Sequence, residues 1–234
     1  MGLFLTAETF HDKHKGETCL VMGNGPSLDM YDLSKVTCRT IGMNRSWRKF
    51  VSDYHCSMGD RAYLREIEQH KWEPKILFIL MGKRSDDYLA RWTYRHIRVG
   101  RIIGLPRVVG VAKGDNFRFD YGCDLVKGIR PGITGQMAIM VAVFLGFTNI
   151  CLLGYDCNQN QGHFKFYGDG RPAEPFGHDI RADRACQISH FDKLAECVKK
   201  HHPGTNILNL NPKSAIKCWP FADFSMVCKA EDEH

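Results

Sequence analysis

The chain has 234 residues, of which 44% are hydrophobic and 25% are charged. A domain usually takes ~100–200 residues, so residues 1–234 are expected to form one domain with a full hydrophobic core. This composition excludes a disordered or collagen-like chain. The net charge is +6, from 32 Lys and Arg against 26 Asp and Glu. That excess permits an anionic substrate but lies far below the charge density of a protein that coats DNA.

Ten cysteines are spread along the whole chain, and no two of them form a C-x-x-C pair. Several, such as Cys19 and Cys151, stand in apolar runs, which is typical of free buried thiols in a reducing compartment. The first six residues carry no basic group, unlike the start of a secretory signal peptide. These features indicate a cytoplasmic protein.

Short apolar runs in the first 81 residues predict four β-strands. They lie at 18–22, 40–44, 53–58 and 75–81. A helix is expected at 61–69, and 83–107 and 110–130 are expected to lack regular structure.

Residues 137–154 are nearly free of charge and approach the length of a membrane span. The turn at 146–149 interrupts them, so a buried helix at 136–145 followed by a strand at 150–153 is the better interpretation. A loop at 157–184, a helix at 185–201 and a strand at 206–210 complete the chain. This alternation predicts an α/β fold, a Rossmann-like doubly wound and mostly parallel sheet, with 157–184 as a lid loop or small subdomain.

Ligands of such sheets bind at the carboxyl ends of the strands, where this chain carries three candidate sequences, at 23–27, 44–47 and 154–158. Gly23-Asn24-Gly25-Pro26-Ser27 follows the first strand, and its glycines would let a phosphate approach the backbone. Thr134-Gly135 opens the buried helix, whose free amides favour an anion. Asp156 ends the strand after it, where a carboxylate can bind a ribose. Each sequence would serve equally well as an ordinary turn or helix cap.

Three histidines, His163, His178 and His190, lie in or just after the loop at 157–184 and are candidate proton-transfer groups. With eleven histidines in the chain, most must have no such role. The sequence contains no D-x-D pair, which many nucleotide-sugar enzymes use to hold a divalent metal on the diphosphate. We therefore expect neither a metal nor another cofactor.

The segment 83–127 is predicted to be a variable basic insert. Its first part holds Arg91, Arg95 and Arg98 together with Trp92 and Tyr94. Basic and aromatic side chains in alternation can bind a nucleic-acid backbone and its bases, or a phosphate-rich small molecule. A solvated face that pairs with its own acidic residues is the simpler alternative.

Together these motifs resemble the bacterial sialyltransferases of glycosyltransferase family 42. They resemble equally a related Rossmann-like family that includes 6-hydroxymethylpterin diphosphokinase. The likeness covers about residues 18–60 and 128–215. It rests on the glycine turn at 23–28, Met43-Asn44-Arg45, Ile133-Thr134-Gly135 and Gly154-Tyr155-Asp156.

The resemblance implies a role for each matching residue. The donor nucleotide would contact the residues that follow: Gly23, Asn24, Gly25, Ser27, Asn44, Asp60, Thr134, Gly135 and, at the ribose, Asp156. In the sialyltransferases a histidine after the lid acts as general base, and tyrosine hydroxyls stabilise the departing phosphate. Here the base would be His178 or His190. Asn158 stands where the catalytic tyrosine is expected, so Tyr167 would replace it.

The leading hypothesis is a metal-independent glycosyltransferase that moves a sugar from a nucleotide-activated donor, such as a CMP-sugar, to a hydroxyl acceptor. The acceptor could be anionic or modified DNA, held by Arg91, Arg95 and Arg98. The alternatives are a Mg²⁺-dependent pyrophosphokinase acting on a pterin-like alcohol and a non-catalytic nucleotide-binding module.

Overall fold

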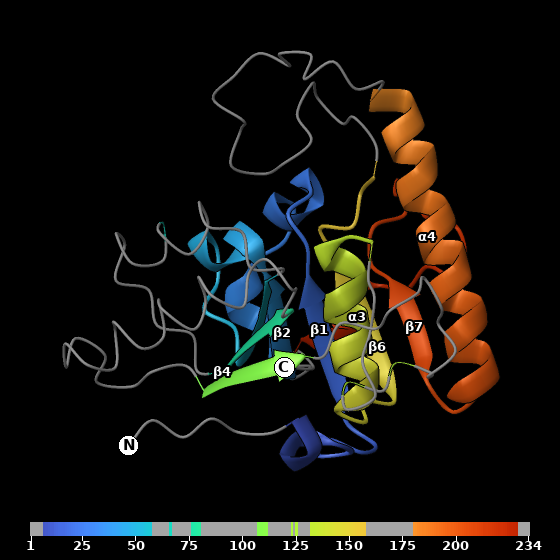
Figure 1. The fold of residues 1–234 in the computed structure, drawn as a ribbon. Coiled ribbons are helices and arrows are strands. Elements are labelled where there is room, and N and C mark those ends of the chain that lie inside the picture. Colours follow the sequence, from blue (N-terminus) through green and yellow to red (C-terminus); the bar gives the residue numbers. More distant parts are fainter. Residues whose placement is uncertain are drawn as a thin grey trace.

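The computed structural model describes residues 7–57, 66, 76–80, 107–111, 123, 125, 132–157 and 180–228. Its centre is a seven-stranded sheet in the order β5-β4-β3-β2-β1-β6-β7, and every strand pair is parallel (Figure 1). The strands are β1 (Thr18–Met22), β2 (Arg39–Met43), β3 (Tyr54–Ser57), β4 (Ile76–Leu80), β5 (Arg107–Val111), β6 (Asn149–Leu153) and β7 (Asn206–Asn209). The predicted α/β fold with a parallel sheet is confirmed.

The strands are apolar on both sides because both faces of the sheet are covered. Cys19 and Val21 of β1 pack towards α3 (Thr134–Phe144). Leu20 and Met22 point to the opposite face. That face is covered by short 3-10 helices, η2 (Pro26–Asp29), η3 (Leu33–Lys35) and η5 (Phe224–Val227).

The two long helices lie on the first face in different ways. Every residue of α3 from Gly135 to Phe144 is buried, which explains why its sequence is apolar all round. In contrast, α4 (Ile180–His201) buries a stripe that includes Phe191, Leu194 and Val198 and exposes Lys199 and Lys200. Because α4 begins at Ile180, the last five residues of the predicted lid at 157–184 are helical. The rest of that segment, 158–179, lies outside the described residues.

The turn between α3 and β6 explains why the apolar stretch at 137–154 is not a membrane span. Gly146 adopts φ +86°, a left-handed conformation that favours glycine, and it ends α3 as predicted. No helix in the described parts of the chain is long and apolar enough to cross a membrane.

One sequence prediction needs correction. Residues 107–111 form the edge strand β5, although this stretch was expected to lack regular structure and belongs to the predicted basic insert. The glycine turn after β1 continues into the short 3-10 helix η2.

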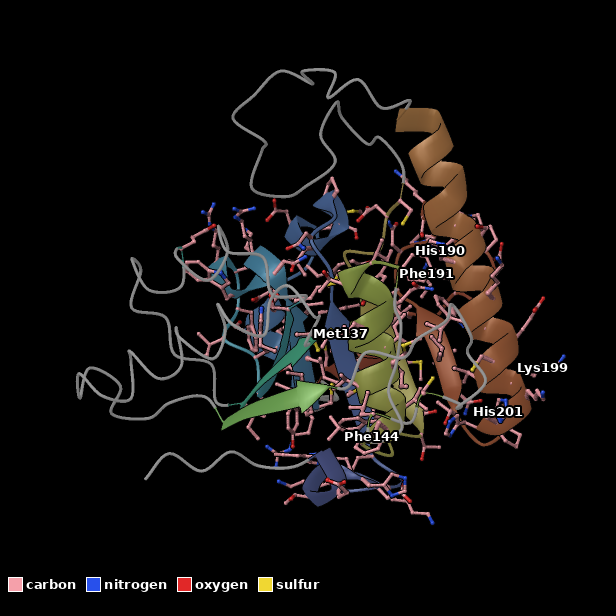
Figure 2. All side chains as sticks on the ribbon, viewed as in Figure 1. Met137, Phe144, His190, Phe191, Lys199 and His201 are labelled. Carbon is pink, nitrogen blue, oxygen red and sulfur yellow. The ribbon has the colours of Figure 1, made fainter. Side chains whose placement is uncertain are left out.

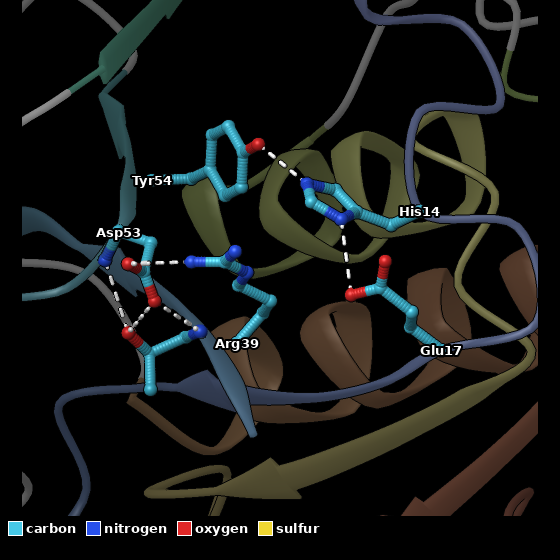
Figure 3. Close-up of polar contacts among 6 residues, drawn as sticks. His14, Glu17, Arg39, Asp53 and Tyr54 are labelled. Atoms are coloured by element: carbon cyan, nitrogen blue, oxygen red, sulfur yellow. Dashed lines mark hydrogen bonds and ion pairs between the residues drawn. The ribbon is translucent and has the colours of Figure 1, made fainter. Parts of the chain in front are cut away.

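The segment before β1 lies at the amino ends of the strands, and Figure 3 shows the side-chain contacts that His14 makes there. The backbone N–H groups of Asp12 and His14 donate to the carbonyls of Phe144 and Leu145 at the end of α3. The His14 ring stacks on Phe147 at 4.7 Å. Its two nitrogens bond Glu17 over 3.1 Å and the Tyr54 hydroxyl over 2.5 Å. These contacts fix the end opposite to the candidate site.

Candidate functional site

The turns that follow β1 and β6 are in direct contact at the point where the strand order reverses. The backbone N–H of Gly23 donates to the Leu153 carbonyl over 2.7 Å, and that of Gly25 donates to the Gly154 carbonyl over 2.8 Å. A Cβ on Gly23 would lie only 2.2 Å from the Gly154 oxygen, so no other residue fits. In open α/β sheets this reversal point is where ligands bind.

Asp156 stands at the centre of this contact and is only 2% exposed. Its carboxylate accepts hydrogen bonds from the Ser27 hydroxyl over 2.9 Å, the Ser27 amide over 3.2 Å and the Asn211 side chain over 2.8 Å. A Cβ on Gly25 would lie 1.8 Å from the Asp156 Oδ2 atom. Burial raises the pKa of Asp156, and the bonds from Ser27 and Asn211 oppose that rise. The carboxylate is thus surrounded by donors from its own chain.

The segment after β7 completes the site from the far end of the chain. Besides Asn211, it contributes Ser214, whose hydroxyl donates to the Tyr155 carbonyl over 2.7 Å. The backbone N–H of Ala215 donates to the Asp156 carbonyl over 2.8 Å. Sequence reasoning missed these residues, and the only local signal was an Asn-Pro turn at 211–212 directly after a strand.

Asn24 lies between the two contacts of the glycine turn. Its side-chain oxygen is buried, and no described residue offers it a hydrogen bond. A buried amide oxygen without a donor is costly, so it is a natural acceptor for an N–H or O–H group of a ligand.

Asn44 follows β2, the strand on the other side of β1. It adopts φ +47° and begins η4 (Asn44–Arg48). Its carbonyl accepts a hydrogen bond from Nε2 of His55 over 2.9 Å. In η4, Arg45 and Arg48 both pair with Glu66, the former over 2.6 Å. Two guanidinium groups share one carboxylate here.

The N-terminus of α3 faces the same edge of the sheet. Its N-cap residue is Ile133 rather than Thr134, and the Ile133 side chain makes no capping hydrogen bond. The first amides of an α-helix have no partner within the helix and attract anions. Gly135 packs closely inside the core, where the Tyr155 hydroxyl donates to its carbonyl over 3.0 Å.

His190 of α4 lies beside the N-terminus of α3, as Figure 2 shows together with its neighbour Phe191. A Cβ on Gly132 would lie 2.6 Å from the His190 ring. Gln136, fully buried, joins the two helices: it accepts from the Gly132 amide over 2.7 Å and donates to the His190 carbonyl over 2.7 Å. The structure therefore brings His190 to the same end of α3 as Thr134.

The structure brings together most of the predicted site residues. They lie at the carboxyl ends of β1, β2 and β6, at the adjoining end of α3 or, for His190, on α4 beside that end. These residues are Gly23, Asn24, Gly25, Ser27, Asn44, Thr134, Gly135, Asp156 and His190. The remaining predicted residues lie outside the described ones: Asp60, His163, Tyr167, His178, Arg91, Arg95 and Arg98. Among the described residues no group of three or more His, Cys, Asp or Glu side chains could hold a metal ion. The nine cysteines whose side chains the structure describes are free thiols.

Comparison with known proteins gives matches to solved structures. The sialyltransferase CstII from Campylobacter jejuni in complex with the substrate analogue cytidine-5'-monophosphate (CMP) matches with a TM-score of 0.52 at 13% identity. That match covers 92% of this chain and 88% of CstII. CstII with CMP-3FNeuAc gives 0.52 at 14%, covering 92% and 89% of the two chains. CST-II with a trisaccharide acceptor and CMP gives 0.51 at 14%, with the same coverage.

No protein-family model and no curated protein sequence matches the chain. At 13–14% identity the structural matches concern the fold, and they extend over nearly the whole length of both partners. The chain therefore has the α/β fold seen in the CstII sialyltransferase.

Proposed function

We propose that this protein is a metal-independent glycosyltransferase that transfers a sugar from a CMP-activated donor to a hydroxyl group. The observation that carries the proposal is the convergence of the predicted site residues at one edge of the sheet, in a fold that CstII shares. Neither the fold nor the residues would suffice alone, since one fold hosts many functions.

The donor nucleotide would bind where the ends of β1 and β2 meet the N-terminus of α3. The first amides of α3 and the two guanidinium groups of η4 favour a phosphate. The buried Asn24 oxygen is available to a donor group of the nucleotide. Asp156 is best assigned to holding Ser27 and the turn in place, because its oxygens already accept three protein donors.

In the proposed reaction the acceptor hydroxyl oxygen attacks the anomeric carbon of the sugar. The bond from that carbon to the phosphate oxygen breaks, and its electron pair leaves with CMP. A histidine, His190 or His178, takes the hydroxyl proton as general base. Thr134, Asn44 and Tyr167 would donate hydrogen bonds to the departing phosphate, so that no metal is required.

The acceptor is expected to be recognised by the basic segment that contains Arg91, Arg95 and Arg98. An anionic acceptor, including modified DNA, would bind with an affinity that falls steeply as salt rises. Replacing the three arginines by glutamine should remove that salt dependence. Binding that does not change with salt would contradict an anionic acceptor.

The first test is nucleotide selectivity. We expect CMP to raise the melting temperature of the protein more than UMP, GMP or AMP does, since a ligand of the folded state stabilises it. Incubation with CMP-sialic acid and a panel of hydroxyl acceptors should then release CMP. Stabilisation by ATP with Mg²⁺ instead would favour a pyrophosphokinase, and no effect of any nucleotide would contradict both enzymatic functions.

A further inference from the structure

We propose that His55 is a positioning residue that sets the geometry of the nucleotide site through a hydrogen bond to the backbone of Asn44. This inference rests on the proposed function, because Asn44 is assigned there to the donor phosphate. Nothing in the sequence motifs includes His55, which lies inside β3.

Asn44 needs such support because of its backbone. Its φ of +47° lies in the left-handed region, which asparagine tolerates better than most residues but which surrounding contacts must still hold. It is the first residue after β2, so this single conformation decides where η4 and the Asn44 side chain leave the sheet. A small change here would displace every group that η4 carries.

His55 supplies the support through one hydrogen bond. The ring is fully buried, and its Nε2–H donates to the Asn44 carbonyl over 2.9 Å. A carbonyl accepts only, so Nε2 must carry the proton; Nδ1 is then free to accept from the Ser52 hydroxyl, 3.3 Å away. Burial lowers the pKa of His55 to about 3, so the ring stays neutral in this tautomer at neutral pH.

The orientation of the His55 ring is restricted, because backbone and polar groups surround it closely. A Cβ on Gly42 would lie 2.7 Å from His55 Nδ1, 2.7 Å from the Ser52 hydroxyl and 2.8 Å from the Ser46 hydroxyl. The Ser46 hydroxyl in turn accepts from the backbone N–H of Met43, one residue before Asn44. Ser46, Ser52 and His55 thus surround Gly42 in one buried cluster, which bonds the Met43 amide and the Asn44 carbonyl at the end of β2.

Two substitutions of nearly equal size separate the hydrogen bond from mere packing. His55→Gln keeps an N–H donor at the distance of Nε2, whereas His55→Met has similar length and no donor. Titration calorimetry with CMP should give a dissociation constant for His55→Gln within about threefold of the wild type, and His55→Met should bind about tenfold more weakly. A purely structural role would lower the fraction of protein that binds and leave the dissociation constant of that fraction unchanged.

Hydrogen exchange provides a second measurement that needs no ligand. Amides of residues 44–48 should exchange faster in His55→Met than in His55→Gln, while those of β1 and β6 stay the same. Equal exchange in the two variants, or equal CMP affinities, would overturn the role of His55. A wild-type protein that binds no CMP would instead overturn the proposed function, and the exchange comparison alone would then decide whether His55 holds the turn.

Discussion

The Ser27 hydroxyl donates to Oδ2 of Asp156 over 2.9 Å and accepts from the backbone N–H of Gly154 over 3.1 Å. A single oxygen atom therefore connects the turn after β1 with the turn after β6. Both partners are buried, so water cannot replace Ser27 if it is lost.

We expect Ser27→Ala to lower the free energy of unfolding by about 1–3 kcal/mol, because it leaves a buried carboxylate and a buried amide each short of a partner. Urea denaturation would measure the change. Ser34→Ala is the matched control: Ser34 also donates to an aspartate, Asp32, but at an exposed site. Its loss should stay within ~0.5 kcal/mol. Similar losses in both variants would mean that the Ser27 bonds contribute no more than surface bonds do.

Asp156→Asn tests whether the carboxylate touches the nucleotide. If Asp156 held the ribose, the variant would lose the preference for CMP over 2′-deoxy-CMP. Because its oxygens already accept from Ser27 and Asn211, we expect that preference to persist while the melting temperature falls. Titration calorimetry measures the affinities for both nucleotides. Equal affinities of Asp156→Asn for CMP and 2′-deoxy-CMP would show that Asp156 binds the ribose after all.

The strands and α3 were predictable because burial on both sides leaves a local signature, an apolar run bounded by glycine or polar turns. β5 was not, since Gly110 and the arginine-rich residues before it resemble a loop. The turns that carry Asn24, Asn44 and Asp156 were also found from sequence, as each lies at or just after the end of a predicted strand. Their partners were not: Asn211 lies 55 residues from Asp156, and Gln136 lies 54 residues from His190. No local pattern encodes such pairings.

His55 should make the fold sensitive to acid. Its pKa is about 3 in the folded protein against 6.5 in a model compound, so below pH 6.5 the unfolded chain binds a proton that the folded protein does not. Between pH 6.5 and about 3 this group should lower the free energy of unfolding by up to about 1.4 kcal/mol per pH unit. His55→Gln removes the titrating group and should flatten the profile. Urea denaturation from pH 7 to pH 4 measures the free energy of unfolding of both proteins. Parallel pH profiles of the wild type and His55→Gln would contradict the effect assigned to His55.

The choice of general base can be made by comparing two histidines. We expect replacement of the true base, His190 or His178, by alanine to lower transfer from CMP-sialic acid by about 10²–10⁴-fold, the usual contribution of a general base. CMP affinity should hardly change, because the base faces the acceptor. His201→Ala, at the opposite end of α4, is the control and should retain activity. Full activity of both His190→Ala and His178→Ala would exclude the proposed base.

Chelation tests the metal-independent mechanism. Since tyrosine, threonine and asparagine donors are assigned to the leaving phosphate, transfer should continue at an unchanged rate in excess EDTA. The measurement is the rate of CMP release before and after chelation, with Mg²⁺ added back. Loss of activity that Mg²⁺ restores would contradict the proposed mechanism.

The pairing of β1 with β6 has a consequence for how the protein is made. Thr18 of β1 lies beside Asn149 of β6, 131 residues further along the chain. At ~5–20 residues per second, a ribosome needs on the order of ten seconds to supply that partner. During this time one edge of the central strand stays open in the nascent chain, as does the apolar face that α3 later covers. Fragments that stop before β6 should therefore aggregate or require a chaperone during synthesis.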